Sequence, residues 1–231
     1  MPIHNADDSA VTSAWILNDA GGTAALSAAL EQKQFAVSRT VDIDVLHSAT
    51  SVQLVLDEVK ANPPAVLWLN VPAHVHSWTG KASKRLAIML SAMCFYQLTE
   101  LRHVVVEGAP ASLRGWHTSH FDKVLKHPRV STSQIRWCAL GVSDANQLPV
   151  CNYSRLLTTY PIPPSATLCC KSPVASKLRR FPVNMWQQYY SSLADLTVSQ
   201  VFPSNVVKKT KKHKEKVTFI DDVDGPGEHA D

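Results

Sequence analysis

Three polar residues follow apolar runs at positions where their side chains could handle a substrate: Glu107, Asn70 and His74. An amide and an imidazole can both hydrogen-bond a base or a carboxylate. A carboxylate that directly follows three valines is partly desolvated, and such a group is usually either paired or functional. We therefore take these three as candidate catalytic residues. The alternative for Glu107 is an ion pair with one of three arginines, Arg102, Arg114 or Arg155.

A second set of residues has the spacing of a nucleotide-type site: Asp19, Gly21, Gly22, Asp42 and Asp44. Glycines after a strand let the backbone turn tightly and approach a ligand, and the next helix N-terminus favours anionic or polar groups. An acid about 20 residues further on could hold ribose hydroxyls. These residues are candidate cofactor-binding residues. The alternative is an ordinary strand-to-helix turn and a solvated pair of acids.

The sequence favours no metal site. His74 and His76 lie two residues apart, but nothing nearby supplies a third ligand at the spacing of a metal site. Cys169 and Cys170 are adjacent and have no cysteine close to them along the chain, so we interpret them as structural. The predicted site therefore contains no metal.

An alternation of strands and helices must position these residues. Strands are predicted at 14–17, 35–43, 65–69 and 104–106, and later at 134–142 and 154–159. Helices are predicted at 23–33, 51–60, 81–99, 120–126 and 182–196. This order predicts an α/β fold, a Rossmann-like, doubly wound and mostly parallel sheet. Ligands of such sheets bind along the carboxyl ends of the strands, where all the candidate residues would lie.

Composition favours one folded domain with loose ends. The chain has 231 residues, of which 45% are hydrophobic and 18% charged. We expect a flexible N-terminus at 1–12, a single domain at 13–203 and a charged, disordered tail at 204–231. The longest apolar stretch, 86–98, is too short to span a membrane, which takes about 20 residues. With no signal-peptide pattern and an odd number of cysteines, the expected location is intracellular, cytoplasmic or nuclear.

The tail contains a lysine run that could contact nucleic acid. It begins with Lys208, Lys209, Lys211 and Lys212, and an acidic segment follows it. The net charge of the whole chain is only +4, so the body before the run is not a strongly basic nucleic-acid binder. So short a run supports non-specific, salt-sensitive contact or a nuclear-import signal.

The order of the motifs resembles the methyltransferase-like α/β region of protist (dinoflagellate-type) retrotransposon polyproteins and, more distantly, the cytosine-C5 DNA methyltransferases. The resemblance covers residues 14–196. It rests on 17–22 at the methyl-donor loop, 69–73 at the catalytic Pro-Cys loop, and 106–112 with Trp116 at the glutamate loop. Residues 134–136, in the order of a Gln-x-Arg element, and 180–182, entering a helix, also fit.

The resemblance implies a degenerate member of that family. In the active enzymes a cysteine thiolate attacks the cytosine ring, a glutamate holds the base, and S-adenosylmethionine donates the methyl group. Here Ala73 stands at the cysteine position and Asp19 stands where the donor loop has glycine, whereas Glu107 is kept. We therefore expect a catalytically silent methyltransferase-like domain that acts in binding or assembly, with S-adenosylmethionine as the cofactor to test.

Two other functions stay open at this point. The chain could be an active S-adenosylmethionine-dependent methyltransferase of non-C5 type, with Asn70 and His74 acting at an amino group, where no covalent nucleophile is needed. It could also be a nuclear or nucleic-acid-associated protein that uses its basic tail. The expected partners are accordingly nucleic acid or a larger protein assembly, and no membrane.

Overall fold

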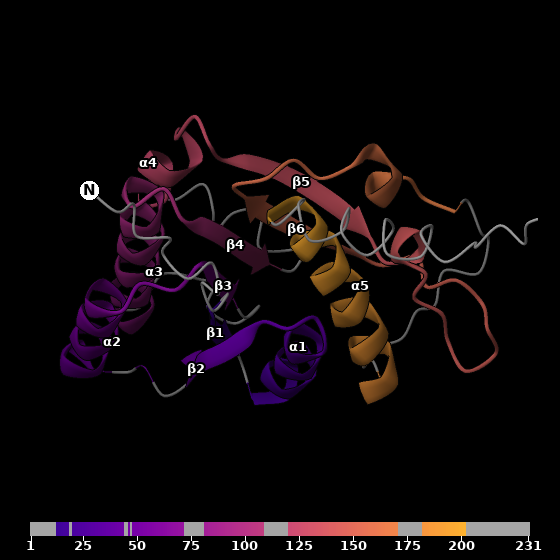
Figure 1. Cartoon of the computed structure of the whole chain (residues 1–231), viewed down its shortest axis with the longest axis horizontal. Coiled ribbons are helices and arrows are strands. Elements are labelled where there is room, and N and C mark those ends of the chain that lie inside the picture. The colour runs from indigo at the N-terminus through magenta and orange to yellow at the C-terminus, as the bar shows by residue number, and fades with distance from the viewer. Residues whose placement is uncertain are drawn as a thin grey trace, which may run out of the picture.

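The short apolar runs form one sheet in which the first four strands lie side by side and parallel (Figure 1). The computed structural model describes residues 13–18, 20–43, 46, 48–71, 81–108, 120–170 and 182–201. The strands are β1 (Ser13–Asn18), β2 (Ala36–Asp42), β3 (Val66–Val71), β4 (His103–Gly108), β5 (Ser131–Arg136) and β6 (Tyr153–Thr158). Their order across the sheet is β2-β1-β3-β4-β6-β5, and β6 runs antiparallel to both of its neighbours. The predicted Rossmann-like, mostly parallel α/β fold is confirmed.

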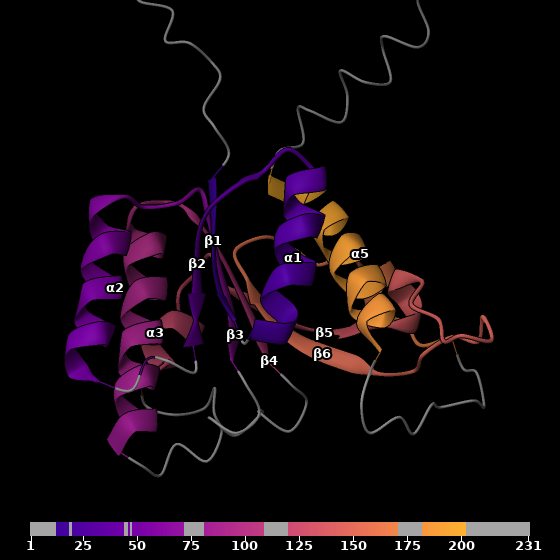
Figure 2. The same cartoon turned by 90° about the horizontal axis from the view of Figure 1, so that it is seen from below.

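Helices cover both faces of this sheet (Figure 2). Helices α1 (Ala20–Gln32) and α5 (Val183–Val201) lie together on one face, and α2 (Ala49–Ala61) and α3 (Lys81–Thr99) lie on the other. A single turn, α4 (Asp122–Leu125), packs near α3. Among the described residues, no helix combines the length and the apolar character that crossing a membrane requires.

Each face of the sheet has its own apolar core, because successive side chains of a strand point to opposite faces. In β4, Val104 and Val106 belong to the core under α2 and α3, whereas Val105 belongs to the core under α1 and α5. In β3, Leu67 and Trp68 divide between the two cores in the same way. Strands buried on both faces explain why the sequence of this region is almost continuously apolar.

The sequence prediction is wrong in one connection that matters below. The strand predicted at 134–142 begins earlier, at Ser131, and ends at Arg136, and the 3₁₀ turn η4 (Cys138–Leu140) follows it. The Trp137 amide donates to the Asn152 carbonyl at 2.9 Å, and Gly141 closes the turn with φ of 79°. A positive φ is easily adopted by glycine, so this residue turns the chain away from the sheet. The predicted segments 1–12 and 204–231 lie outside the described residues.

Candidate functional site

Polar side chains form a row across four parallel strands where these strands end. In the strand register Asn18 of β1 pairs with Asp42 of β2, and Asn70 of β3 pairs with Glu107 of β4. Leu17 pairs with Leu69, so Asn18 and Asn70 are the next residues along these two neighbouring strands. We call Asp42, Asn18, Asn70 and Glu107 the strand-end row. The fold thus brings together three of the segments that the sequence singled out.

The strand-end row lies on the face that α1 and α5 cover. Two positions earlier in the same strands, Ile16, Trp68 and Val105 belong to the core under these helices, and residues two apart point to the same face. Asn18 and Glu107 are buried, with Glu107 only 3% exposed, whereas Asp42 and Asn70 are half-buried. The row is therefore accessible in places and buried in others.

The row spans the point where the direction of the chain's crossovers changes. The connection from β1 through α1 leads outward to β2, whereas the connection from β3 through α3 leads the other way, to β4. Because α1 and α3 lie on opposite faces, a crevice between the ends of β1 and β3 is expected, as in other open α/β sheets. Asn18 and Asn70 stand at the ends of these two strands.

Glycine at position 22 accommodates the buried Asn18. A Cβ added at Gly22, in the first turn of α1, would lie 2.5 Å from the Asn18 side-chain nitrogen. Such a distance requires the asparagine to shift. Gly22 was predicted to let the backbone approach a ligand. In the structure, its lack of a side chain leaves room for the side chain of Asn18 in the strand-end row. Gly21 lies beside it in the same turn.

The Glu107 carboxylate belongs to a buried hydrogen-bond network. Ser154 of β6 donates its hydroxyl to Glu107 Oε1 at 3.2 Å, and the Trp137 indole N–H donates to the Ser154 oxygen at 3.1 Å. Tyr189 of α5 stacks on Trp137 with ring centroids 4.7 Å apart. Burial, followed by the charge of Glu107, raises the pKa of Tyr189 well above its ordinary value. Of the arginines considered for Glu107, Arg102 donates to the Pro63 carbonyl instead, at 2.7 Å.

The Asn70 amide is also engaged by the fold. Its nitrogen donates to the Tyr190 hydroxyl of α5 at 3.2 Å, and Tyr190 is fully buried. Trp186, one helical turn earlier, stacks on Tyr190 with ring centroids 5.7 Å apart. Aromatic residues of α5 therefore cover the β3–β4 half of the strand-end row.

Several predicted site residues lie outside the described residues, and their predictions remain untested. They are Asp19, Asp44, Ala73, His74, Lys208, Lys209, Lys211 and Lys212. The Gln134–Arg136 element is described, and it lies on β5 at the edge of the sheet, separated from β3 by two strands. Gln134 is exposed, and the Arg136 guanidinium lies 5.0 Å from the centre of the Tyr153 ring. This element does not contribute to the strand-end row.

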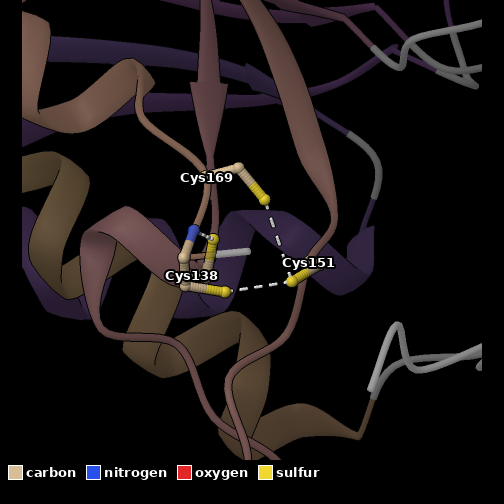
Figure 3. Close-up of side chains that lie close together, drawn as sticks. Cys138, Cys151 and Cys169 are labelled. Atoms are coloured by element: carbon tan, nitrogen blue, oxygen red, sulfur yellow. Dashed lines mark hydrogen bonds between the residues drawn. The ribbon is translucent and has the colours of Figure 1, made fainter. Parts of the chain in front are cut away.

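Sequence reasoning missed a cluster of four cysteines, Cys138, Cys151, Cys169 and Cys170 (Figure 3). All four sulfur atoms lie within 4.8 Å of one another. Hydrogen bonding to the Cys170 thiol is the main cause that raises the pKa of Cys151 to about 12, and burial raises that of Cys138. The available signal was compositional: four of the five cysteines fall between positions 138 and 170.

A depression on the surface is separate from the strand-end row. It has a volume of about 590 Å³ and lies between α5 and the turns η4 and η5 (Pro164–Thr167). Small and apolar side chains line it, among them Leu140, Ala166 and Ser192. It contains no residue of the strand-end row and is open to solvent, so we do not regard it as the site.

Comparison with known proteins adds no family to this description. No family model matches the chain, and no curated protein or solved structure is significantly similar to it. A function for this protein therefore has to be inferred from the strand-end row, the cysteine cluster and the motifs of the sequence.

Proposed function

We propose that this chain is a catalytically silent methyltransferase-like domain that acts in binding or assembly. One observation carries the proposal: the two described side chains expected to handle a substrate are engaged by the fold. Asn70 donates to Tyr190, and Glu107 is buried and accepts from Ser154. A substrate that bound to either side chain would have to compete with its hydrogen-bond partner inside the fold. The predicted roles of Asn70 and Glu107 in catalysis thus give way to a structural role.

The missing nucleophile supports the same proposal. Methylation of cytosine at C5 requires a thiolate that attacks the ring, and the sequence has Ala73 where the resemblance places that cysteine. Cys94 is no substitute, because it is fully buried in α3 and burial strongly raises its pKa. The clustered cysteines are also poor nucleophiles where their pKa values are raised.

The β1–β2 half of the strand-end row is the part suited to a ligand. Asp42 is half-buried at the end of β2, and the first turn of α1 begins beside the end of β1. A carboxylate in this position can accept hydrogen bonds from ribose hydroxyls, and a helix N-terminus favours a carboxylate of the ligand. S-adenosylmethionine carries both groups, so it is the ligand that we propose for this half.

Titration calorimetry with S-adenosylmethionine and S-adenosylhomocysteine tests the binding half of the proposal. We expect Asp42→Asn to weaken both by about tenfold, which corresponds to about 1.4 kcal/mol. Gly22→Ala should weaken both as well, because the new methyl group displaces Asn18. Gly141→Ala is the matched control: it strains a turn with φ of 79° and meets no atom within 4 Å, so it should leave ligand binding unchanged.

Incubation with methyl-labelled S-adenosylmethionine and either DNA or RNA tests whether the chain is catalytically silent. We expect no methyl transfer to either substrate. Label at cytosine C5 would contradict the proposal, and label on an exocyclic amino group would favour the active, non-C5 methyltransferase. If neither adenosyl ligand binds, the methyltransferase-like assignment of the β1–β2 half is wrong.

A further inference from the structure

The cysteine cluster draws its members from two connections of the chain, β5–β6 and β6–α5. Cys138 opens the turn η4 after β5, Cys151 lies two residues before β6, and Cys169 and Cys170 follow η5. The hydrogen bond from the Trp137 amide to the Asn152 carbonyl brings the two ends of the β5–β6 connection side by side. The Cys170 amide donates to the Cys138 sulfur at 3.4 Å and so holds the β6–α5 connection against them. These hydrogen bonds help to direct four thiols to one point.

Sulfur–sulfur distances in the cluster match those of four ligands around one cation. Cys151 Sγ lies 3.1 Å from Cys170 Sγ and 4.0 Å from Cys169 Sγ. Zinc binds thiolates at about 2.3 Å in tetrahedral geometry, which places neighbouring sulfur atoms about 3.8 Å apart. The two measured distances lie on either side of this value, and none of the sulfur pairs exceeds 4.8 Å. Only small side-chain adjustments would therefore complete a tetrahedron.

We propose that Cys138, Cys151, Cys169 and Cys170 form a structural zinc site. Four thiolates are soft ligands, which select zinc over the hard cations magnesium and calcium. Four protein ligands close the coordination sphere, as in structural rather than catalytic zinc sites. The amide hydrogen bond to the Cys138 sulfur is the kind of support that neighbouring groups give to metal ligands. A single disulfide would use only two of the four thiols and would leave the other pair unexplained.

The zinc would fasten the connections that complete the strand-end row. Ser154, which follows Cys151 by three residues, donates to Glu107, and Trp137, which precedes Cys138, donates to Ser154. The two ligands, which lie next to Trp137 and near Ser154 in the chain, would fix the β5–β6 connection relative to β4. The metal therefore acts on the architecture of the row and not on a substrate.

The full chain, purified under reducing conditions without chelators, provides the test. We expect mass spectrometry of the metal content to find one zinc per chain. Replacement by Co²⁺ should give the absorption bands of a tetrahedral site with thiolate-to-metal charge transfer. Cys151→Ser should weaken zinc binding by more than about 100-fold, since loss of groups that merely support a ligand already costs about 10–100-fold.

Two further variants keep the test decisive. Cys94→Ala removes a cysteine that is buried in α3 outside the cluster, and it should keep one zinc per chain. Cys169→Ser combined with Cys170→Ser alters two exposed residues, so the chain should stay folded while zinc is lost. The proposal is overturned if the reduced wild-type chain binds no zinc, if it binds iron in preference, or if this double variant binds zinc as tightly as the wild type.

Discussion

The strand-end row and the cysteine cluster lie at the same edge of the sheet but are assembled in opposite ways. The row takes one residue from each of four strands, and the register of the strands alone sets their spacing. The cluster takes all its residues from connections, beyond the ends of β5 and η5 and before the start of β6. Because β6 runs antiparallel to β4, its first residues lie beside the end of β4, as Figure 2 lets the reader follow.

The two regions also differ in how their polar groups are paired. In the β3–β4 half of the row, Asn70 donates to Tyr190, and one carboxylate oxygen of Glu107 accepts from Ser154. In the cluster, four thiols crowd together, and their proximity raises the pKa of Cys151. Buried polar groups with hydrogen-bond partners stabilise a structure, whereas four sulfur atoms that meet at one point can act together as the ligands of a cation. The cluster is therefore the region for which we propose a metal.

Removal of the metal should have the largest effect on stability. A ligand that binds only the folded state stabilises it by about 4 kcal/mol when its free concentration is about 1,000 times Kd. We therefore expect a strong zinc chelator to lower the free energy of unfolding of the wild-type chain by an amount of this order, measured by urea denaturation. Added zinc in excess of the chelator should restore it.

Cys151→Ser is the control for this experiment. Its stability should be low at the outset and should not respond to the chelator, because the site no longer holds zinc. If the chelator destabilised the variant and the wild type equally, the metal would act elsewhere in the chain. If it destabilised neither, the cluster would contribute nothing to stability, and the contrast drawn between the two regions would fail.

The sequence predicted the strand-end row well because the position of each member depends mainly on the strand that carries it. Asn18, Asn70 and Glu107 each end an apolar run, and Asp42 lies near the end of a predicted strand. The carboxyl ends of parallel strands must meet at one edge of the sheet. Asn70 and Glu107 were therefore expected near each other, and the β3–β4 register confirms it. What the sequence could not show is that α5 reaches this edge. The contact between Asn70 and Tyr190 joins residues 120 positions apart.

The sequence failed at the cysteines because a strand pattern was extended too far. Residues 137–142 are mostly apolar, so they favoured a continuation of the strand, but the Trp137–Asn152 hydrogen bond and Gly141 turn the chain. The spacing of the four cysteines matches no common pattern of zinc ligands. Their meeting depends on the antiparallel pairing of β5 with β6 and on the path through η5, which only the folded chain reveals.

Substitution of Glu107 should have a smaller effect, and it tests whether the row is structural. Glu107→Ala leaves the Ser154 hydroxyl without its acceptor and opens a cavity in the core under α5, so we expect a loss of about 2–3 kcal/mol. Glu107→Gln keeps the shape and an acceptor oxygen, so it should cost less than about 1 kcal/mol. Urea denaturation of each variant, with zinc present, measures both.

Glu100→Ala provides the matched control, because this glutamate is exposed after α3 and its removal should change stability by no more than about 0.5 kcal/mol. A different order of stability among the Glu107 variants would change the structural role given to the strand-end row. If Glu107→Ala were as stable as Glu107→Gln, the carboxylate would not be an internal partner. Glu107 would then return as a candidate for substrate binding.

The smallest expected effect concerns the opposite end of β4, where His103 begins the strand. Its Nδ1 lies 3.1 Å from the Thr159 hydroxyl, and burial, together with the charge of Arg129, lowers its pKa. The unfolded chain therefore binds a proton near the ordinary histidine pKa, about 6.5, that the folded chain takes up only at lower pH. Stability should fall as the pH drops from 7 to 5. For one proton the slope stays below about 1.4 kcal/mol per pH unit, and solvent around the half-exposed ring reduces it further.

Loss of zinc also destabilises the chain at low pH, because thiolates must remain deprotonated to bind it. The measurement therefore needs the chelator in both the wild type and His103→Gln, whose amide can still hydrogen-bond Thr159. Under these conditions the difference between the two chains isolates the histidine, and the wild type should lose more stability between pH 7 and 5. An equal loss would mean that His103 is protonated as easily in the folded chain as in the unfolded one.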